Sequence, residues 1–236
     1  MKKLLFIALA LFTLAPAMAQ EERKDRIISS YLYAFGNLPA QSEIDYWMTD
    51  ALSSKNVSEL INAHKNNIKN NQSLADRAIR HSYLDAMGRE PRSDEYNYWR
   101  GQKLPYSVLM DNHVNWLRSN PAEFSTVIKR SYQTVFNRQP QNIELNNWKN
   151  AGARSFISLV QTHQKNVRAG MFAPANATSQ KLISDPKSGV NFKPSDAVKN
   201  EMGKFIATNG GTVISTGGGN VISTGGGNVI STGGGN

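Results

Sequence analysis

Apolar residues recur at helical spacing through most of residues 22–170. In three segments, an aromatic residue is followed four positions later by another large apolar residue, so that the two share one helix face. These pairs are Tyr31 and Phe35, Tyr83 and Met87, and Tyr132 and Phe136. The other apolar stretches of this region also form a stripe opposite a polar face, which is typical of helices packed against one another. The pattern predicts nine helices, three in each segment.

Five landmark residues keep the same order in the three segments: a tyrosine, a glycine or asparagine, a proline, a glutamate and a tryptophan. They are Tyr31, Gly36, Pro39, Glu43 and Trp47; Tyr83, Gly88, Pro91, Glu95 and Trp99; and Tyr132, Asn137, Pro140, Glu144 and Trp148. The tyrosines are 52 and then 49 residues apart. The sequence therefore predicts an all-α fold of three helical repeats, each of about 50 residues and three helices, forming a bundle or a short superhelix.

The residues between the first and second helix of each repeat indicate a helix stop and a restart. Gly36, Gly88 and Asn137 tolerate the left-handed backbone conformation that ends many helices. The proline three residues later prevents the first helix from resuming. Two residues after the proline, Ser93 and Asn142 are suitable N-caps for the second helix. The repeated glutamate then falls in the first turn, where the helix dipole favours an anion.

A family resemblance is carried by the second copy. Its residues read Leu84-Asp85-Ala86-Met87-Gly88-Arg89-Glu90-Pro91, followed by Tyr98-Trp99. This resembles the signature of a bacterial domain of unknown function, in which a helical turn reads Leu-Gly-Arg-x-Pro…Tyr-Trp. That domain occurs in secreted, surface-layer-type and adhesin-like proteins, so the resemblance, which covers residues 24–170, implies a helical fold in an extracellular setting. The arginine of the signature makes Arg89 and Arg138 candidate interaction residues, whereas the first copy has Asn37 there.

A third helix is predicted in each repeat, at residues 58–69, 105–118 and 154–169. Each contains a histidine with apolar residues four positions before and after it: His64, His113 and His163. One interpretation is a metal or acid–base site. The other is a half-buried structural histidine whose ring nitrogen caps a neighbouring backbone carbonyl. We favour the structural role, because equivalent residues lie one per repeat and are not brought together.

The repeated tyrosines and tryptophans also have two interpretations, as sugar-stacking platforms or as core between helices. The core is favoured because Phe and Met share their helix face. Tyr106 and Trp116 do not recur in the other repeats, and they are therefore candidates for exposed contacts with a partner.

Residues 1–19 have the features of a signal peptide. Lys2-Lys3 is followed by an apolar stretch from Leu4 to Leu14, and Ala17-Met18-Ala19 precedes a cleavage point at Gln20. The apolar stretch is shorter than the roughly 20 residues that span a bilayer, so we expect no transmembrane segment after cleavage. Because the chain has no cysteine, its stability must come from packing rather than from disulfides. The predicted location is outside the cytoplasm, in the periplasm, at the cell surface or in the medium.

The C-terminal part changes character. Residues 20–170 are expected to form the helical module, residues 171–194 a Pro-containing linker, and residues 195–208 a short helix capped by Ser195. Residues 209–236 are a low-complexity Gly-rich tail in which the unit Val-Ile-Ser-Thr-Gly-Gly-Gly-Asn starts at Val213, Val221 and Val229. The tail is either a flexible spacer or a set of short strands that pair between copies, and disorder in the monomer is favoured.

Composition and missing motifs narrow the function. The net charge falls from +9 to +7 without Lys2 and Lys3, and the basic residues are scattered among acidic ones, so nucleic acid is not expected as a partner. No cysteine nucleophile, His-Glu-x-x-His, Gly-x-Ser-x-Gly or phosphate-binding loop occurs. Each repeated glutamate lacks the second carboxylate that glycoside hydrolysis needs. We therefore expect no enzyme, cofactor or metal site.

The prediction is a non-catalytic exported envelope or extracellular protein with a structural or interaction role. Its helical module would dock on an envelope protein or a surface glycan. Its tail would act as a spacer or as an assembly element through self-association. The alternative is a secreted protein that binds glycans, or an enzyme that acts on glycans or depends on a metal.

Overall fold

The computed structural model describes residues 2–151, 154–170 and 192–211. This part of the chain forms ten α-helices and one short 3-10 helix, with no strand, so the fold is all-α as predicted. The helices up to residue 168 follow one another in three sets, which we call units 1, 2 and 3. Unit 1 contains α1 (Lys2–Phe35), α2 (Gln41–Thr49), the 3-10 helix η1 (Ala51–Ser54) and α3 (Val57–Asn70).

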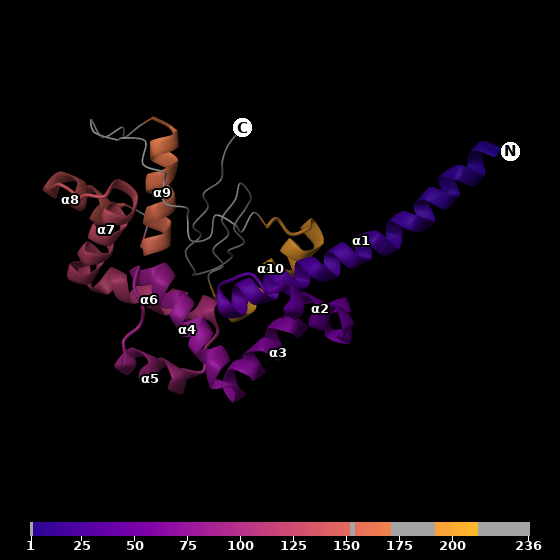
Figure 1. Cartoon of the computed structure of the whole chain (residues 1–236), viewed down its shortest axis with the longest axis horizontal. Helices are drawn as coiled ribbons and strands as arrows, with labels where there is room; N and C mark the ends of the chain where they lie inside the picture. Colours follow the sequence, from indigo (N-terminus) through magenta and orange to yellow (C-terminus); the bar gives the residue numbers. More distant parts are fainter. Residues whose placement is uncertain (1, 152–153, 171–191, 212–236) are drawn as a thin grey trace.

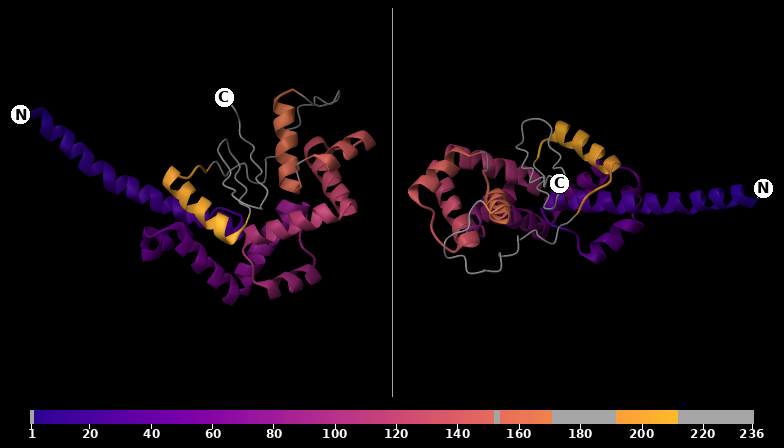
Figure 2. Two further views of the ribbon diagram at one scale, coloured as in Figure 1. Left: turned by 180° about the vertical axis from the view of Figure 1, so that it is seen from behind. Right: turned by 90° about the horizontal axis from the view of Figure 1, so that it is seen from above.

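Unit 2 contains α4 (Gln72–Met87), α5 (Ser93–Gln102) and α6 (Tyr106–Ser119), and unit 3 contains α7 (Pro121–Phe136), α8 (Asn142–Asn150) and α9 (Phe156–Arg168). The last helix, α10 (Asp196–Asn209), lies beside α1 in two views (Figure 2). Helix α1 runs through the expected cleavage point at Gln20, and its N-terminal half extends beyond the other helices (Figure 1). The linker prediction for residues 171–191 and the tail from residue 212 lie outside the described residues.

The first helix of each unit ends where the residue types predicted. Gly36, Gly88 and Asn137 follow α1, α4 and α7 with φ of 74°, 68° and 52°. The amide of each donates to the carbonyl four residues earlier, at 3.1–3.2 Å for all three. A residue in the left-handed region turns the chain out of the helix while it satisfies one of the last helical carbonyls.

The second helices begin one residue earlier than we predicted. The N-caps are Ala40, Arg92 and Gln141, and Ser93 and Asn142 are the first helical residues. None of the three N-caps has a side-chain hydrogen bond to the helix. Instead, the glutamate three residues on accepts a hydrogen bond from the N-cap amide, at 2.7 Å in each unit. The glutamate thus supplies one half of a capping box, and the N-cap itself needs no particular side chain.

The third helix of a unit joins it to the unit before. Helices α3, α6 and α9 pack on α1, α4 and α7 of their own units, and α6 and α9 also pack on α1 and α4 of the preceding units. Tyr106 begins α6 against Gly36, and Phe156 begins α9 against Gly88. A Cβ on either glycine would lie 2.7 Å from the Cγ of the facing ring. Because packing is this close, glycine is required there for its small size as well as for its backbone.

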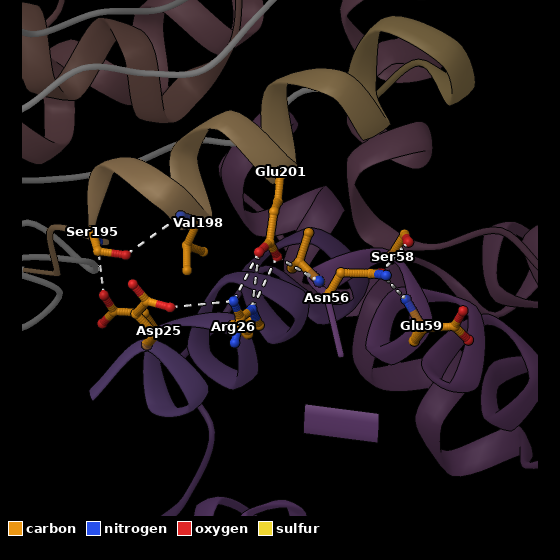
Figure 3. Close-up of polar contacts among 10 residues, drawn as sticks. Asp25, Arg26, Asn56, Ser58, Glu59, Ser195, Val198 and Glu201 are labelled. Atoms are coloured by element: carbon orange, nitrogen blue, oxygen red, sulfur yellow. Dashed lines mark hydrogen bonds and ion pairs between the residues drawn. The ribbon is translucent and has the colours of Figure 1, made fainter. Parts of the chain in front are cut away.

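Helix α10 closes the other side of unit 1. Its apolar residues form a buried cluster with α1 and α3, whose members are Tyr33, Val57, Ile61, Val198, Met202, Phe205 and Ile206. Both carboxylate oxygens of Glu201 in α10 accept hydrogen bonds from Arg26 of α1 (Figure 3). One of them also accepts, at 2.8 Å, from the amide of Val57, where α3 begins. The amide of Ser195 donates to Asp25 at 2.7 Å (Figure 3). The predicted short helix is therefore an integrated part of the helical fold.

Candidate functional site

Each unit contains the same arrangement of a tyrosine, a tryptophan and a histidine, which we call the aromatic cluster. The tryptophan Nε1 donates to the tyrosine hydroxyl, at 3.1 Å from Trp47 to Tyr31 in unit 1. The corresponding distances in units 2 and 3 are 3.0 and 2.8 Å. The histidine ring lies edge-on to both rings, with its centroid 4.5 Å from Tyr31 and 5.0 Å from Trp47 for His64. The repeated aromatic residues thus lie between the helices.

The histidines are more buried than we expected and have a different partner. His64, His113 and His163 are 1–2% exposed. Their Nε2 atoms lie 3.1 Å from the hydroxyls of Ser30, Ser82 and Ser131, whereas we expected a backbone carbonyl as the partner. Each serine hydroxyl donates its single proton to the carbonyl three residues before it, at 2.7–2.8 Å. The histidine must therefore donate from Nε2, which fixes its tautomer.

Burial also keeps these rings neutral. It lowers the pKa of His64 and His113 to about 3 and that of His163 to about 4. A buried cation has lost the solvation that would stabilise it. The repeated glutamate of each unit favours the charged ring, but the loss of solvation is larger and the paired arginine acts in the same direction as burial. A neutral ring with a committed Nε2 proton is suited to holding three helices together. It is poorly suited to exchanging protons with a substrate near neutral pH.

A glutamate–arginine pair covers each aromatic cluster. Arg89 donates to both oxygens of Glu95 at 2.6 Å in unit 2. Arg138 does the same to Glu144 at 2.7 and 2.8 Å in unit 3. Burial disfavours the charged form of Glu95, but the hydrogen bonds from Arg89 and from the Arg92 amide outweigh it, and the pKa of Glu95 is lowered. The arginines stack over Tyr83 and Tyr132, so they serve the cluster as well as the carboxylate.

Unit 1 obtains its arginine from the next unit. Asn37 stands at the arginine position, and Arg77 of α4 takes over its contacts. The Arg77 guanidinium donates to Glu43 at 2.6 Å and to Asn37 at 3.0 Å. It lies over the rings of Tyr31 and Phe35, 5.4 and 5.0 Å from their centroids. The charge pair is thus made in all three units, but in unit 1 it also connects two units.

Unit 2 contains a pocket of about 520 Å³ in front of its aromatic cluster. Buried Tyr83 and His113 and half-buried Trp99 line its inner part. Exposed side chains line its mouth: Arg92 and Tyr98 from the start and middle of α5, and Asn112 and Trp116 from α6. Glu123 of α7 faces them from the following unit. The volume is within the range of small-molecule binding sites, about 300–1,000 Å³.

Units 1 and 2 differ in the origin of the arginine that covers the aromatic cluster. In unit 1, Arg77 reaches over Tyr31, Phe35, Asn37 and Glu43. The equivalents of these four in unit 2 are Tyr83, Met87, Arg89 and Glu95, and all of them line the pocket. The equivalent of Arg77 itself, five residues before the repeated serine, is Thr126. In unit 2 the pairing arginine comes from the same unit, because Arg89 donates to Glu95 and lies over Tyr83. Helix α7 contributes a different contact, from Arg130 to the Met87 carbonyl at 2.9 Å.

The pocket brings together two of the four predicted interaction residues. Trp116 is 47% exposed at its mouth, and Arg89 lines it. Arg138 is paired in unit 3 and lies elsewhere. The expectation that Tyr106 is exposed is wrong: it is 1% exposed, packs on Gly36, and its hydroxyl donates to buried Asp85 at 2.7 Å. Tyr106 packs on the preceding unit. The sequence pattern did not reveal this contact, because tyrosine does not recur at this position in the other repeats.

Sequence reasoning missed several residues for different reasons. The serine partners of the histidines were visible, because each directly precedes the repeated tyrosine, but we did not single them out. Tyr98 was quoted only as part of a signature, although it is 61% exposed. Arg92, Asn112 and Glu123 have no repeated pattern, and only their position in space marks them.

Comparisons of the chain with protein families, with curated proteins and with solved structures find no match. In the described part of the chain, no helix combines the length and the apolar character needed to cross a membrane.

Proposed function

We propose that the protein is a non-catalytic, exported binding module that docks on a component of the cell envelope through the pocket of unit 2. The observation that carries this proposal is the pocket itself, where exposed aromatic and polar side chains gather in front of the largely buried aromatic cluster. Aromatic side chains at a preformed concave site are typical of binding sites.

The non-catalytic assignment is supported by the state of the repeated polar groups. The histidines are neutral and hydrogen-bonded to serines. Each repeated glutamate is ion-paired with an arginine and bonded to a helix-start amide. These interactions account for the residue types at those positions without any reaction, since they hold the second and third helices of each unit against the first.

We also propose that the three units are repeats of one module and that α10 caps the array. The recurring serine–histidine, tryptophan–tyrosine and glutamate–arginine contacts support the first part. For the second, Tyr106 and Phe156 rest on the preceding unit, whereas their equivalent in unit 1, Val57, has no preceding unit and packs in the α10 cluster. Terminal repeats of such arrays need a covering element to bury their open face.

The remaining parts of the proposal concern location and the tail. The signal-peptide features of residues 1–19 and the family resemblance support export, and N-terminal sequencing of protein recovered outside the cytoplasm should begin at Gln20. The tail of residues 209–236 would serve as a spacer or in self-association, as its uncharged repetitive sequence suggests. Residues 209–211 belong to the fold, however, because the Tyr33 hydroxyl donates to the carbonyl of Gly210 at 2.9 Å.

The test uses the mature chain, immobilised and exposed to an envelope fraction of the producing cell. Wild-type protein should retain envelope material, and Trp116→Ala should lose most of this capacity. Tyr46→Ala is the matched control, because Tyr46 is 63% exposed in unit 1 and outside the pocket. Equal capture by all three proteins would refute docking through the pocket. Release of new reducing ends from the envelope glycan by the wild-type protein would refute the non-catalytic assignment.

A further inference from the structure

We infer that the ligand of the unit 2 pocket is a neutral sugar ring of an envelope glycan, stacked on Trp116 at the pocket mouth. This inference rests on the proposed function, in which the pocket is the docking site, and it adds the chemical class of the ligand. Three properties of the lining carry it: the aromatic faces at the mouth, the planar polar side chains beside them, and the balance of charge.

Two aromatic side chains are exposed at the pocket mouth, and one of them is held from behind. Trp116 and Tyr98 are 47% and 61% exposed, and both line the pocket. Tyr98 is supported edge-on by Trp99, with ring centroids 4.9 Å apart and an interplanar angle of 80°. Trp99 is in turn bonded to Tyr83 within the buried cluster. A ring held in this way presents a flat apolar face at little cost in conformational entropy, and the C–H face of a pyranose is its natural complement.

The polar groups beside these faces suit a ligand with many hydroxyls. The Asn112 amide nitrogen donates to the Val108 carbonyl at 2.8 Å, which leaves the amide oxygen as an acceptor toward a ligand. The side chain of Arg92 is 67% exposed and supplies donors. Glu123 of α7 also lines the pocket and supplies carboxylate acceptors. A sugar hydroxyl both donates and accepts, so a site with planar groups of both kinds satisfies it, whereas an apolar peptide side chain would leave these groups unpaired.

The charge of the lining favours a neutral ligand. Its ionised side chains are two arginines and two glutamates: Arg89, Arg92, Glu95 and Glu123. Arg89 is neutralised by Glu95, which also lies 3.1 Å from Arg92. His113 adds no charge because burial keeps its ring neutral. An anionic polymer or a nucleic acid needs an excess of positive charge at its site, and this pocket has none.

The first experiment titrates the mature protein with the neutral tetrasaccharides chitotetraose, cellotetraose and maltotetraose, with intrinsic tryptophan fluorescence as the readout. At least one should give a saturable change, because Trp116 and Trp99 line the pocket. Trp116→Ala should weaken binding at least tenfold, and Tyr98→Ala should weaken it several-fold. Tyr46→Ala should bind as wild type, because Tyr46 is the equivalent of Tyr98 in unit 1 and does not line the pocket.

The second experiment separates the ligand class from the docking function. The envelope fraction is divided, and one half is digested with protease and extracted to remove lipid before capture. Capture that depends on Trp116 and survives this treatment supports a glycan. If Trp116-dependent capture is lost, the ligand is a protein or a lipid, which overturns the sugar inference and leaves docking intact. If capture never depends on Trp116, the proposed function fails as well.

Discussion

Replacing Gly88 tests the packing between units 2 and 3 quantitatively. Gly88 has a φ of 68°, and a Cβ built on it would lie 2.7 Å from Cγ of Phe156. An alanine there would experience left-handed strain of about 1–2 kcal/mol. Because the obstacle is a ring at its Cγ and not the end of a flexible side chain, overpacking adds about 1–3 kcal/mol. Gly88→Ala should therefore destabilise the protein by about 2–5 kcal/mol.

Asn137 provides a matched comparison for the two contributions. It occupies the same place at the end of α7 with a φ of 52°, but it is an exposed residue. Asn137→Ala should therefore carry the backbone contribution, about 1 kcal/mol or less, together with the loss of one exposed hydrogen bond from Gln133. Gly88→Asn isolates the packing contribution, since asparagine tolerates the left-handed backbone conformation but its Cβ meets the same ring. It should still cost about 1–3 kcal/mol from overpacking.

The assay is equilibrium urea unfolding followed by far-ultraviolet circular dichroism, with near-ultraviolet signals for tertiary packing. A loss of stability in Gly88→Asn that exceeds the effect of Asn137→Ala would support the contact with Phe156. If Gly88→Asn is as stable as the wild type, α9 does not begin against Gly88 and the arrangement of units 2 and 3 is wrong. Asn137→Gly should be neutral or stabilising.

Three other perturbations test the aromatic clusters and the α10 cap. The pKa of the buried histidines is about 3 to 4 in the folded protein, below the ordinary 6.5. Between these pH values the unfolded chain binds more protons than the folded one. The free energy of unfolding should therefore fall as the pH drops below 6.5. Each histidine should contribute about 1.4 kcal/mol per pH unit to the slope of unfolding free energy against pH. His113→Gln should remove about a third of the total slope of the three histidines, measured by urea titrations at stepped pH. Arg77→Ala should destabilise the protein, and adding Asn37→Arg should restore part of the loss. Truncation after Gly211 should leave the melting temperature unchanged, whereas removal of α10 as well should lower it.

Each of these tests has an outcome that contradicts its premise. A stability that is flat from pH 6.5 to 5 would mean that the histidines are not buried as neutral rings. Loss confined to pH below about 4.5 would assign the effect to carboxylates. If Asn37→Arg does not restore stability, the contacts of Arg77 are not equivalent to those of Arg89 and Arg138. A melting temperature unaffected by loss of α10 would exclude its role as a cap.

The features that the sequence predicted well are those set by local conformational preference. The stops at Gly36 and Gly88 follow from the backbone conformations that these residues accept, whatever surrounds them. The start of α5 was misplaced by one residue, because we assumed that the N-cap side chain makes the capping bond. In fact the Glu95 carboxylate makes it, and this leaves the choice of Arg92 unconstrained.

The features that were missed depend on contacts between units. We predicted that Tyr106 is exposed because it does not recur. It is buried, and its ring packs against Gly36, which is far away in the chain. Arg77 replaces the missing arginine at Asn37 because its side chain reaches from α4 to Glu43 of α2, and no pattern within one repeat indicates this contact. For the same reason, Trp116 and Arg89 were selected separately, and only the structure shows that they share a pocket.

The docking of α10 also determines the order in which the parts of the molecule can fold. Arg26 and Glu201 are 175 residues apart in the chain, whereas the hydrogen bonds between the repeated serines and histidines span only 31–34 residues. Contacts between distant residues close large loops and form late. Units 2 and 3 can thus close as soon as their own residues are available. Unit 1, although it is made first by the ribosome, has to wait with an uncovered apolar face until nearly the whole chain has emerged.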